Sequence, residues 1–143
     1  MAHQDLEATI ERCHVALAEI VKGNSTPWES LFSRQDDVTL GNPFGPFVQG
    51  WTRVVATAAA AASHYRDGEI IGFERIGTYV SHDLACIAEI ERFRAKVGGS
   101  RDVATAALRV TSTFRRENGE WKIVHRHADP ITAPQPARSV IQA

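Results

Sequence analysis

The sequence predicts a single α+β domain in which helices come first and a long antiparallel meander of strands follows. Apolar residues recur at helical spacing only in the first half of the chain. After residue 68 the apolar pattern changes to the two-residue period of strands. The chain has 143 residues, 43% of them apolar and 23% charged, which is enough to bury one full core.

Three helices are expected in the first half of the chain. The first covers residues 5–22 and ends before a Gly-Asn pair. The second covers residues 26–33, because its first four letters, TPWE, supply the cap, the proline and the acid of a helix start. The third covers residues 50–65 and carries apolar side chains along one side. Residues 38–40 predict a brief strand, and residues 42–46 a loop, because two prolines and a glycine interrupt any regular structure there.

The second half is expected to form four long strands. Asn118-Gly119, the pair most typical of a tight hairpin, joins the last two. Residues 1–129 are therefore expected to be one domain, and residues 130–143, which hold three prolines, a loosely attached tail. The expected strands cover residues 69–81, 84–97, 103–117 and 120–129.

Composition excludes several classes of function. The net charge is −1, and the cationic residues do not form the basic stripe that a nucleic-acid binder needs. No uncharged stretch approaches the roughly 20 residues of a membrane span, and residues 1–5 do not resemble a signal peptide. Cys13 and Cys86 are too few for a disulfide framework or a zinc ribbon. We therefore expect a cytoplasmic protein with reduced cysteines, without nucleic-acid or membrane partners.

Counting outward from the Asn118-Gly119 turn assigns side chains of the last two strands to faces. In this register Phe114 faces Ile123 and Ser112 faces His125. The face expected toward the helices and a cavity carries Ser112, Phe114, Trp121, Ile123, His125 and His127. The opposite face carries Arg109, Thr111, Thr113, Arg115, Lys122, Val124 and Arg126.

The neighbouring strand adds two acids. Glu89 and Glu91 alternate onto one face together with Ile87 and Phe93. If this face joins the histidine face, the cavity holds two carboxylates and two imidazoles among aromatic walls. A β-bulge between residues 84 and 97 would invert the assignment.

The order of elements, the segment at residues 37–45 (DVTLGNPFG) and the ending at residues 118–127 (NGEWKIVHRH) carry a family resemblance. The chain resembles the nuclear transport factor 2-like superfamily, and within it the SnoaL-like and ketosteroid isomerase-like proteins. Residues 83–88 (DLACIA) are also similar to a segment of the calcium/calmodulin-dependent kinase association domain. The resemblance implies a cone-shaped (cystatin-like), strongly bent antiparallel sheet covered by three N-terminal helices. It implies no single activity, because the superfamily contains enzymes and non-catalytic assembly domains.

The chain departs from both relatives at their functional positions. The catalytic aspartate of ketosteroid isomerases matches Asn42, and an amide cannot take a proton as a carboxylate does. The first helix also lacks the tyrosine that those enzymes use. The pocket arginines of the kinase association domain match Glu91 and Ser112. The resemblance therefore implies the fold without the isomerase mechanism.

His125, His127, Glu89 and Glu91 are the candidate catalytic residues. Histidine titrates near neutral pH and a buried carboxylate can become a general base, so the sharpest hypothesis is a dyad of His125 with Glu89 or Glu91. In the alternative reading, the histidines only hydrogen-bond their neighbours and the acids pair with strand arginines. His125 and His127 with either acid could also share a metal, although we expect no metal site.

Two functions remain open from the sequence. The first is a cofactor-independent isomerase, cyclase or dehydratase that acts by proton transfer on a small, partly apolar ring or carbonyl compound. The second is a non-catalytic ligand-binding or homo-oligomeric assembly domain. A homodimer is expected through the convex sheet face that carries Arg109, Thr111, Thr113, Lys122 and Arg126. The candidate ligand contacts are Trp28, Phe32, Asn42, Phe44, Trp51, Ser112 and Phe114. Aromatic residues of this kind are more often part of the core, and Asn42 can instead cap its loop.

Overall fold

The computed structural model describes residues 2–142 and shows three helices followed by a long meander of strands. Helix α1 ends where Gly23 adopts a φ of 100°, a left-handed conformation that stops a helix. The elements are α1 (Ala2–Ile20), α2 (Thr26–Glu29), β1 (Thr39–Gly41), β2 (Val48–Gln49), α3 (Trp51–Ala62), β3 (Tyr65–Val80), β4 (Leu84–Val97), β5 (Val103–Glu117), β6 (Glu120–Asp129) and a 3₁₀ helix η1 (Ala137–Val140).

The six strands form one mixed sheet in the order β2-β1-β6-β5-β4-β3. The prediction of a purely antiparallel sheet was wrong, because β1 runs parallel to β6. This parallel pair arises where the loop after α2 returns to the sheet edge, a connection that the periodicity of single strands does not reveal. The expected hairpin turn is present, with Asn118 and Gly119 at φ 51° and 80°, the left-handed pair that a tight turn requires.

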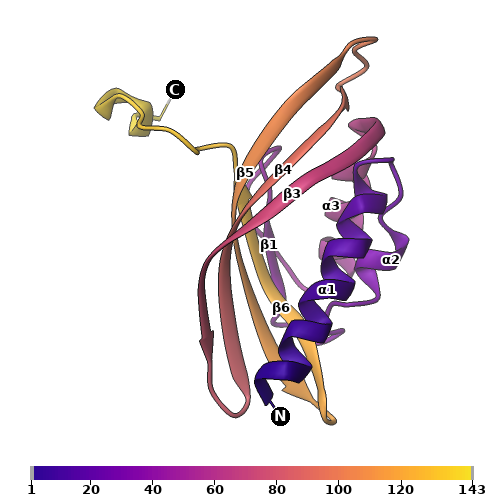
Figure 1. The fold of residues 1–143 in the computed structure, drawn as a ribbon, viewed down its shortest axis with the longest axis vertical. Coiled ribbons are helices and arrows are strands. Elements are labelled where there is room, and N and C mark those ends of the chain that lie inside the picture. Colours follow the sequence, from indigo (N-terminus) through magenta and orange to yellow (C-terminus); the bar gives the residue numbers. More distant parts are fainter. Residues whose placement is uncertain (1, 143) are drawn as a thin grey trace.

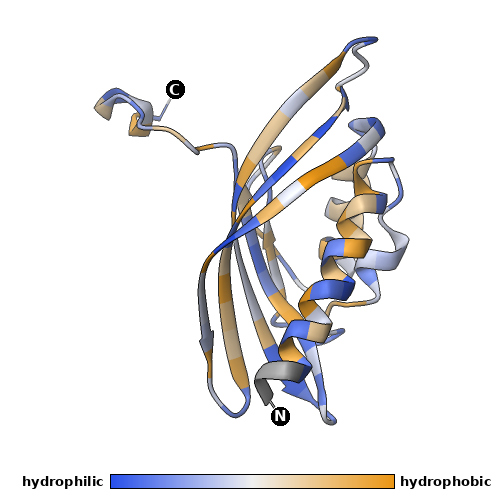
Figure 2. Ribbon diagram, viewed as in Figure 1, coloured by the Kyte–Doolittle hydropathy of each residue, from blue (hydrophilic) through white to orange (hydrophobic). Residues whose placement is uncertain are grey.

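Figure 1 shows a curved sheet with α1, α2 and α3 together on one face, which we call the inner face. The opposite, outer face carries no helix, and the chain beyond β6 projects away on that side. Apolar and hydrophilic residues alternate along α1 (Figure 2), and its apolar residues Leu6, Ile10 and Leu17 are buried in the core. The predicted α+β arrangement is thus confirmed in its order of elements.

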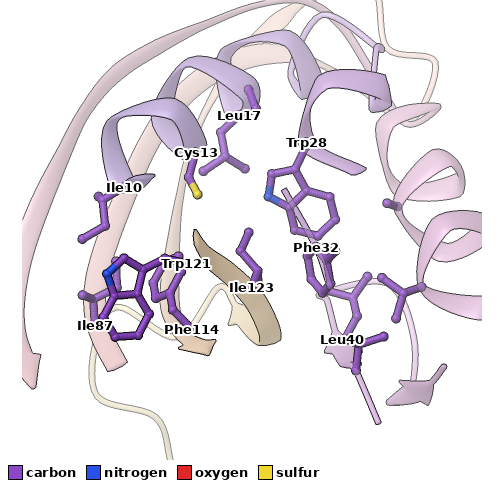
Figure 3. Packing of buried hydrophobic residues seen from close by; sticks show 14 of the residues in the cluster. Ile10, Cys13, Leu17, Trp28, Phe32, Leu40, Ile87, Phe114, Trp121 and Ile123 are labelled. Atoms are coloured by element: carbon purple, nitrogen blue, oxygen red, sulfur yellow. The ribbon is translucent and has the colours of Figure 1, made fainter. Parts of the chain in front are cut away.

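The main core lies between α1, α2, α3 and the inner face. Figure 3 shows Cys13 and Leu17 of α1 above Ile123 and Phe114 of the last hairpin. The residues of this core cluster that are 2% exposed or less are Leu6, Ile10, Ala16, Phe32, Val38, Leu40, Val54, Phe114 and Ile123. Phe32 and Phe114, two of the predicted ligand contacts, are therefore core residues.

Several boundaries differ from those predicted. Tyr65 begins β3 rather than ending α3, and α2 stops at Glu29 instead of residue 33. Strand β3 also contains three register shifts against β4, which bend this edge strand. The short strand β2 was not predicted at all. Among the described helices, none has the length and apolar character needed to cross a membrane.

Candidate functional site

Strand β4 places its two acids on the inner face of the sheet. Glu89 and Glu91 are 5% and 4% exposed, and they alternate with the outward-facing Ala88 and Ile90. Nearby Ala85, Ile87 and Phe93 on the same face are buried in the core. Both carboxylates therefore lie on the inner face, as the alternation predicted, although only Glu91 lines the cavity described below.

The predicted placement of His125 and His127 was wrong. The register of β5 with β6 follows the prediction from the turn as far as Phe114 opposite Ile123, but Thr113 then pairs with His125. Val124 is therefore an extra residue in a bulge, and every later side chain of β6 changes face. His125 and His127 lie opposite Thr113 and Thr111 on the outer face.

The same bulge brings Arg126 to the inner face, opposite Ser112. Arg126 was predicted on the convex face, yet it is 8% exposed. Its two terminal nitrogens donate to the two carboxylate oxygens of Glu91 at 2.8 and 3.0 Å. Burial would lower the pKa of Arg126, but the Glu91 carboxylate outweighs it and the pKa lies above its ordinary value. The guanidinium also lies 5.8 Å from the ring of Trp28.

Glu89 has a different set of partners. It accepts from His14 of α1 at 2.9 Å and from Arg75 of β3 at 2.9 Å, and Arg75 also bonds Glu7 of α1. Burial opposes the ionisation of Glu89, but the hydrogen bonds from His14 and Arg75 outweigh it and lower its pKa. The ring of His14 stacks on Phe73 at 3.6 Å between centroids.

His14, Glu7 and Arg75 were not predicted as site residues. Glu7 and His14 are seven residues apart on α1, so both lie along one edge of its apolar stripe. In the sequence, the seven-residue spacing of Glu7 and His14 on α1 was the one signal that could have indicated a polar contact with the buried acids of β4. The predicted dyads of His125 with Glu89 or Glu91 are absent, and a histidine of α1 takes that place at Glu89.

A small cavity lies between α1, α3, the loop after β1 and the inner face of the sheet, with a volume of about 50 Å³. Most of its wall is apolar, and its polar side chains are Asn42, Tyr65, Glu91 and Arg126. A volume of this size holds a few water molecules. Of the predicted ligand contacts, Trp28, Asn42 and Phe44 line it.

The remaining predicted ligand contacts lie elsewhere. Trp51 packs against the main core and has the guanidinium of Arg34 over its ring at 5.1 Å. Ser112 is buried on β5. Neither these two side chains nor Phe32 and Phe114 line the cavity.

The polar groups of the cavity are mainly hydrogen-bond donors. Burial raises the pKa of Tyr65 to about 12, so its hydroxyl keeps its proton at neutral pH. Asn42 accepts a bond from the backbone N–H of Phe44 at 3.0 Å through Oδ1, which leaves the amide N–H₂ as a donor. Arg126 has further N–H groups beyond the two that bind Glu91. Glu91 is the sole acid in this wall, and Arg126 holds both its oxygens.

The phenyl ring of Phe44 lines both this cavity and a groove on the surface, as do Asn42 and Ala61. The ring is 4.6 Å from the His64 ring and 5.9 Å from the Tyr65 ring, between centroids. The groove is open, has a volume of about 320 Å³ and lies between the loop after β1 and α3.

The two histidines of the outer face contact other groups. His125 Nδ1 lies 2.7 Å from the hydroxyl of Thr39, and His127 lies 3.4 Å from the carboxylate of Asp129. Phe47 lies beside both rings. Burial, and secondly His127, lower the pKa of His125. Within residues 2–142 no group of three or more potential ligands is placed to hold a metal ion, and the proposed set of both histidines with Glu89 or Glu91 lies on two faces of the sheet.

Comparison with known structures supports the same fold. The chain is similar to a nuclear transport factor 2-like superfamily protein from Salmonella enterica, at 16% identity and a TM-score of 0.73, over 98% of this chain and 96% of that one. It is also similar to a proposed dehydratase of the nuclear transport factor 2-like family from Streptomyces avermitilis, at 19% identity and a TM-score of 0.72, over 93% and 100%. A ketosteroid isomerase-like protein from Erwinia carotovora atroseptica matches at 18% identity and a TM-score of 0.71, over 88% and 96%.

Among curated proteins, none matches this chain in sequence. The family model described as a SnoaL-like domain, in contrast, matches residues 7–133, which include the whole sheet and nearly all of the three helices. The chain belongs to the SnoaL-like domain family, and its fold is the one seen in the nuclear transport factor 2-like proteins to which it is similar.

Proposed function

We propose that this chain binds a small, uncharged and mainly apolar molecule that carries a carbonyl or similar oxygen. The observation that carries the proposal is the set of donors around the cavity, where Tyr65, Asn42 and Arg126 line an otherwise apolar wall. Donors that line a mainly apolar wall favour a ligand that brings them an oxygen acceptor.

The Glu91–Arg126 pair makes a neutral ligand the preferred one. Arg126 already shares its charge with a carboxylate at 2.8 Å, so a ligand carboxylate would approach Glu91 as well as the arginine. A cationic ligand would be repelled by the guanidinium of Arg126. An uncharged oxygen can accept from the donors without either repulsion.

The ligand enters past Phe44. The cavity of about 50 Å³ is too small for most metabolites, but the neighbouring groove of about 320 Å³ shares Asn42, Phe44 and Ala61 with it. Rotation of the Phe44 ring, which is 46% exposed, would create one continuous site. Its outer part would be lined by the alanines of α3.

A competition between ligands of equal shape tests this proposal. Cyclohexanone, cyclohexanecarboxylate and cyclohexylamine are titrated by protein NMR against the wild type, Tyr65→Phe and Tyr79→Phe, the last being a control on an exposed tyrosine of the outer face. We expect cyclohexanone to bind most tightly and Tyr65→Phe to weaken it about tenfold, the effect of one hydrogen bond. Tighter binding of the carboxylate, or equal binding by both tyrosine variants, would contradict the proposal.

Proton-transfer catalysis in the same cavity is the second candidate. It is favoured by Glu91, an acid in the cavity wall, and by the similarity to a proposed dehydratase and a ketosteroid isomerase-like protein. As a base Glu91 would take the α-proton of a ketone and return it, after release from Arg126. Exchange of the α-protons of cyclohexanone in D₂O, followed by ¹H NMR, distinguishes the two. Exchange that depends on Glu91 supports an enzyme, whereas binding without exchange supports a binding domain.

We also propose a homodimer through the outer face, where Thr111, Thr113, His125 and His127 line the central strands. These side chains are only partly buried in the single chain, and no helix covers them (Figure 1). Sedimentation of the wild type against Thr113→Arg tests this interface. A monomer for both proteins would reject it.

A further inference from the structure

The segment after β6 extends from the outer face and buries little against its own domain, where several of its residues, Val140 among them, line an open space together with Ile90 and Arg109 of the sheet. Every residue from 130 to 142 is exposed. Backbone hydrogen bonds at η1 stay within the segment: the N–H of Ser139 donates to the carbonyl of Pro136, and that of Ile141 to the carbonyl of Arg138. Figure 1 shows the segment projecting away from the sheet on the side opposite the helices. We call residues 130–142 the tail.

The tail carries apolar side chains at its far end. Val140 is 87% exposed and Ile141 is 72% exposed, at and just beyond the end of η1. Ordering a turn of helix costs conformational entropy that burial normally offsets. In a single chain neither side chain is buried, so a second surface is needed to stabilise the turn.

An apolar groove of matching character lies at the β3–β4 hairpin. It has a volume of about 290 Å³ and is lined by Tyr79, Val80, Leu84, Cys86 and Thr113, among others. Tyr79 and Leu84 are 67% and 51% exposed. We call this space the hairpin groove.

The charges beside the two features are opposite. Arg138 is the sole charged residue of the tail, and it precedes Val140 by two positions. Asp83, which is 73% exposed, lies in the turn between Ser81 and Leu84 of the hairpin groove. An arginine and a carboxylate at these positions would align a docked tail.

The tail of one chain does not reach its own hairpin groove. Figure 1 shows the β3–β4 turn at one end of the sheet and the tail projecting toward the other end. In a two-fold dimer joined through the outer faces, the two sheets can stack with opposite ends together. The end of one sheet that carries the tail then lies beside the end of the other sheet that carries the hairpin groove. We propose that two copies of this chain exchange tails, with Val140 and Ile141 of each seated in the hairpin groove of the other.

This inference rests on the proposed dimer and adds a specific contact to it. It makes no use of the ligand cavity. A dimer through the outer face alone would leave the tails free in solution. The tail exchange can therefore be rejected while the outer-face dimer stands.

A disulfide across the contact tests the exchange in the full-length chain. Val140→Cys introduces a thiol into the tail, and Cys86 in the groove supplies its partner. Cys13 is buried, and burial raises the pKa of its thiol to about 12, so it does not compete. With oxidised glutathione as the oxidant, we expect a covalent dimer on a non-reducing gel, because a disulfide requires the two Cα atoms to approach within about 7 Å.

Two control variants define the outcome. Val140→Cys with Cys86→Ser should give no covalent dimer, and neither should Val103→Cys, which places a thiol on an exposed valine at the start of β5. A dimer that persists without Cys86, or a disulfide within one chain, would overturn the tail exchange. A non-covalent dimer by sedimentation without any cross-link would overturn the tail exchange alone, whereas a monomer would overturn both proposals.

Discussion

The guanidinium of Arg126 and the carboxylate of Glu91 form a bidentate ion pair inside the domain, with N···O distances of 2.8 and 3.0 Å. Both side chains are at most 10% exposed. Removing two charges from water costs free energy that their attraction only just offsets, so loss of one partner leaves a charge buried alone. Arg126→Met is therefore expected to lower the free energy of unfolding by about 3–5 kcal/mol, as measured by urea denaturation.

The matched control is the double variant Glu91→Leu with Arg126→Met, which removes both charges and retains the volume. We expect it to recover most of the lost stability, because an apolar pair is often as stable as a buried ion pair. A double variant as unstable as the single one would mean that the pair has a role beyond mutual neutralisation.

Acid should weaken the contact of Glu89 with His14 and Arg75. The pKa of Glu89 in the folded protein lies below its ordinary value of 4.5, so below pH 4.5 the unfolded chain binds a proton that the folded protein does not. The stabilising contribution is fully present above pH 4.5 and is lost as the pH falls through the lowered pKa. Glu89→Gln should flatten the dependence of unfolding free energy on pH in that window. Glu74→Gln, at an exposed acid of β3, should leave the slope unchanged.

The sequence predicted the inner face of β4 but not that of β6, and the difference has one physical cause. Alternation assigns faces only while each residue of a strand has one partner. Val124 has none, and this single bulge moves Arg126 into the core and the two histidines out of it. Nothing in the string WKIVHRH marks the extra residue, because apolar and polar residues can alternate from either register.

The contacts of Glu89 with His14 and Arg75 were not predicted, for a different reason. His14 and Arg75 come from α1 and from the edge strand β3, so they meet only when helix and sheet pack together. Periodicity within each element predicted the stripe of α1 but gave no position of that stripe along β4. The cavity depended likewise on the loop after β1, whose path was not predictable from its prolines.

The ring of Phe44 should control entry to the cavity. Phe44→Ala would join the cavity to the groove beside α3, so we expect cyclohexanone to associate faster, as measured by NMR line shape. The control is Phe47→Ala, which removes a ring of similar exposure from the outer-face histidines. Equal rates for both variants and the wild type would exclude Phe44 as the gate.

Gly68 allows the start of β3 to approach the end of α1. Its backbone N–H donates to the carbonyl oxygen of Val21 at 3.1 Å, and a Cβ atom at Gly68 would clash with that same oxygen. Two of the three nearest atoms, the carbonyl oxygen and carbon of Val21, belong to the backbone, so they cannot turn aside as a flexible side chain would. Gly68→Ala should therefore lower the free energy of unfolding by about 1–3 kcal/mol or more, the usual cost of overpacking.

The comparison variant is Gly72→Ala, on the same strand but with no atom within 4 Å of the added carbon. It should be neutral or slightly stabilising, since alanine reduces the conformational entropy of the unfolded chain. The difference between the two variants isolates the contact with Val21 from any general effect of alanine in β3. Equal stabilities in urea denaturation would show that α1 moves away from β3 without cost, and the close approach would then not hold the helix on the sheet.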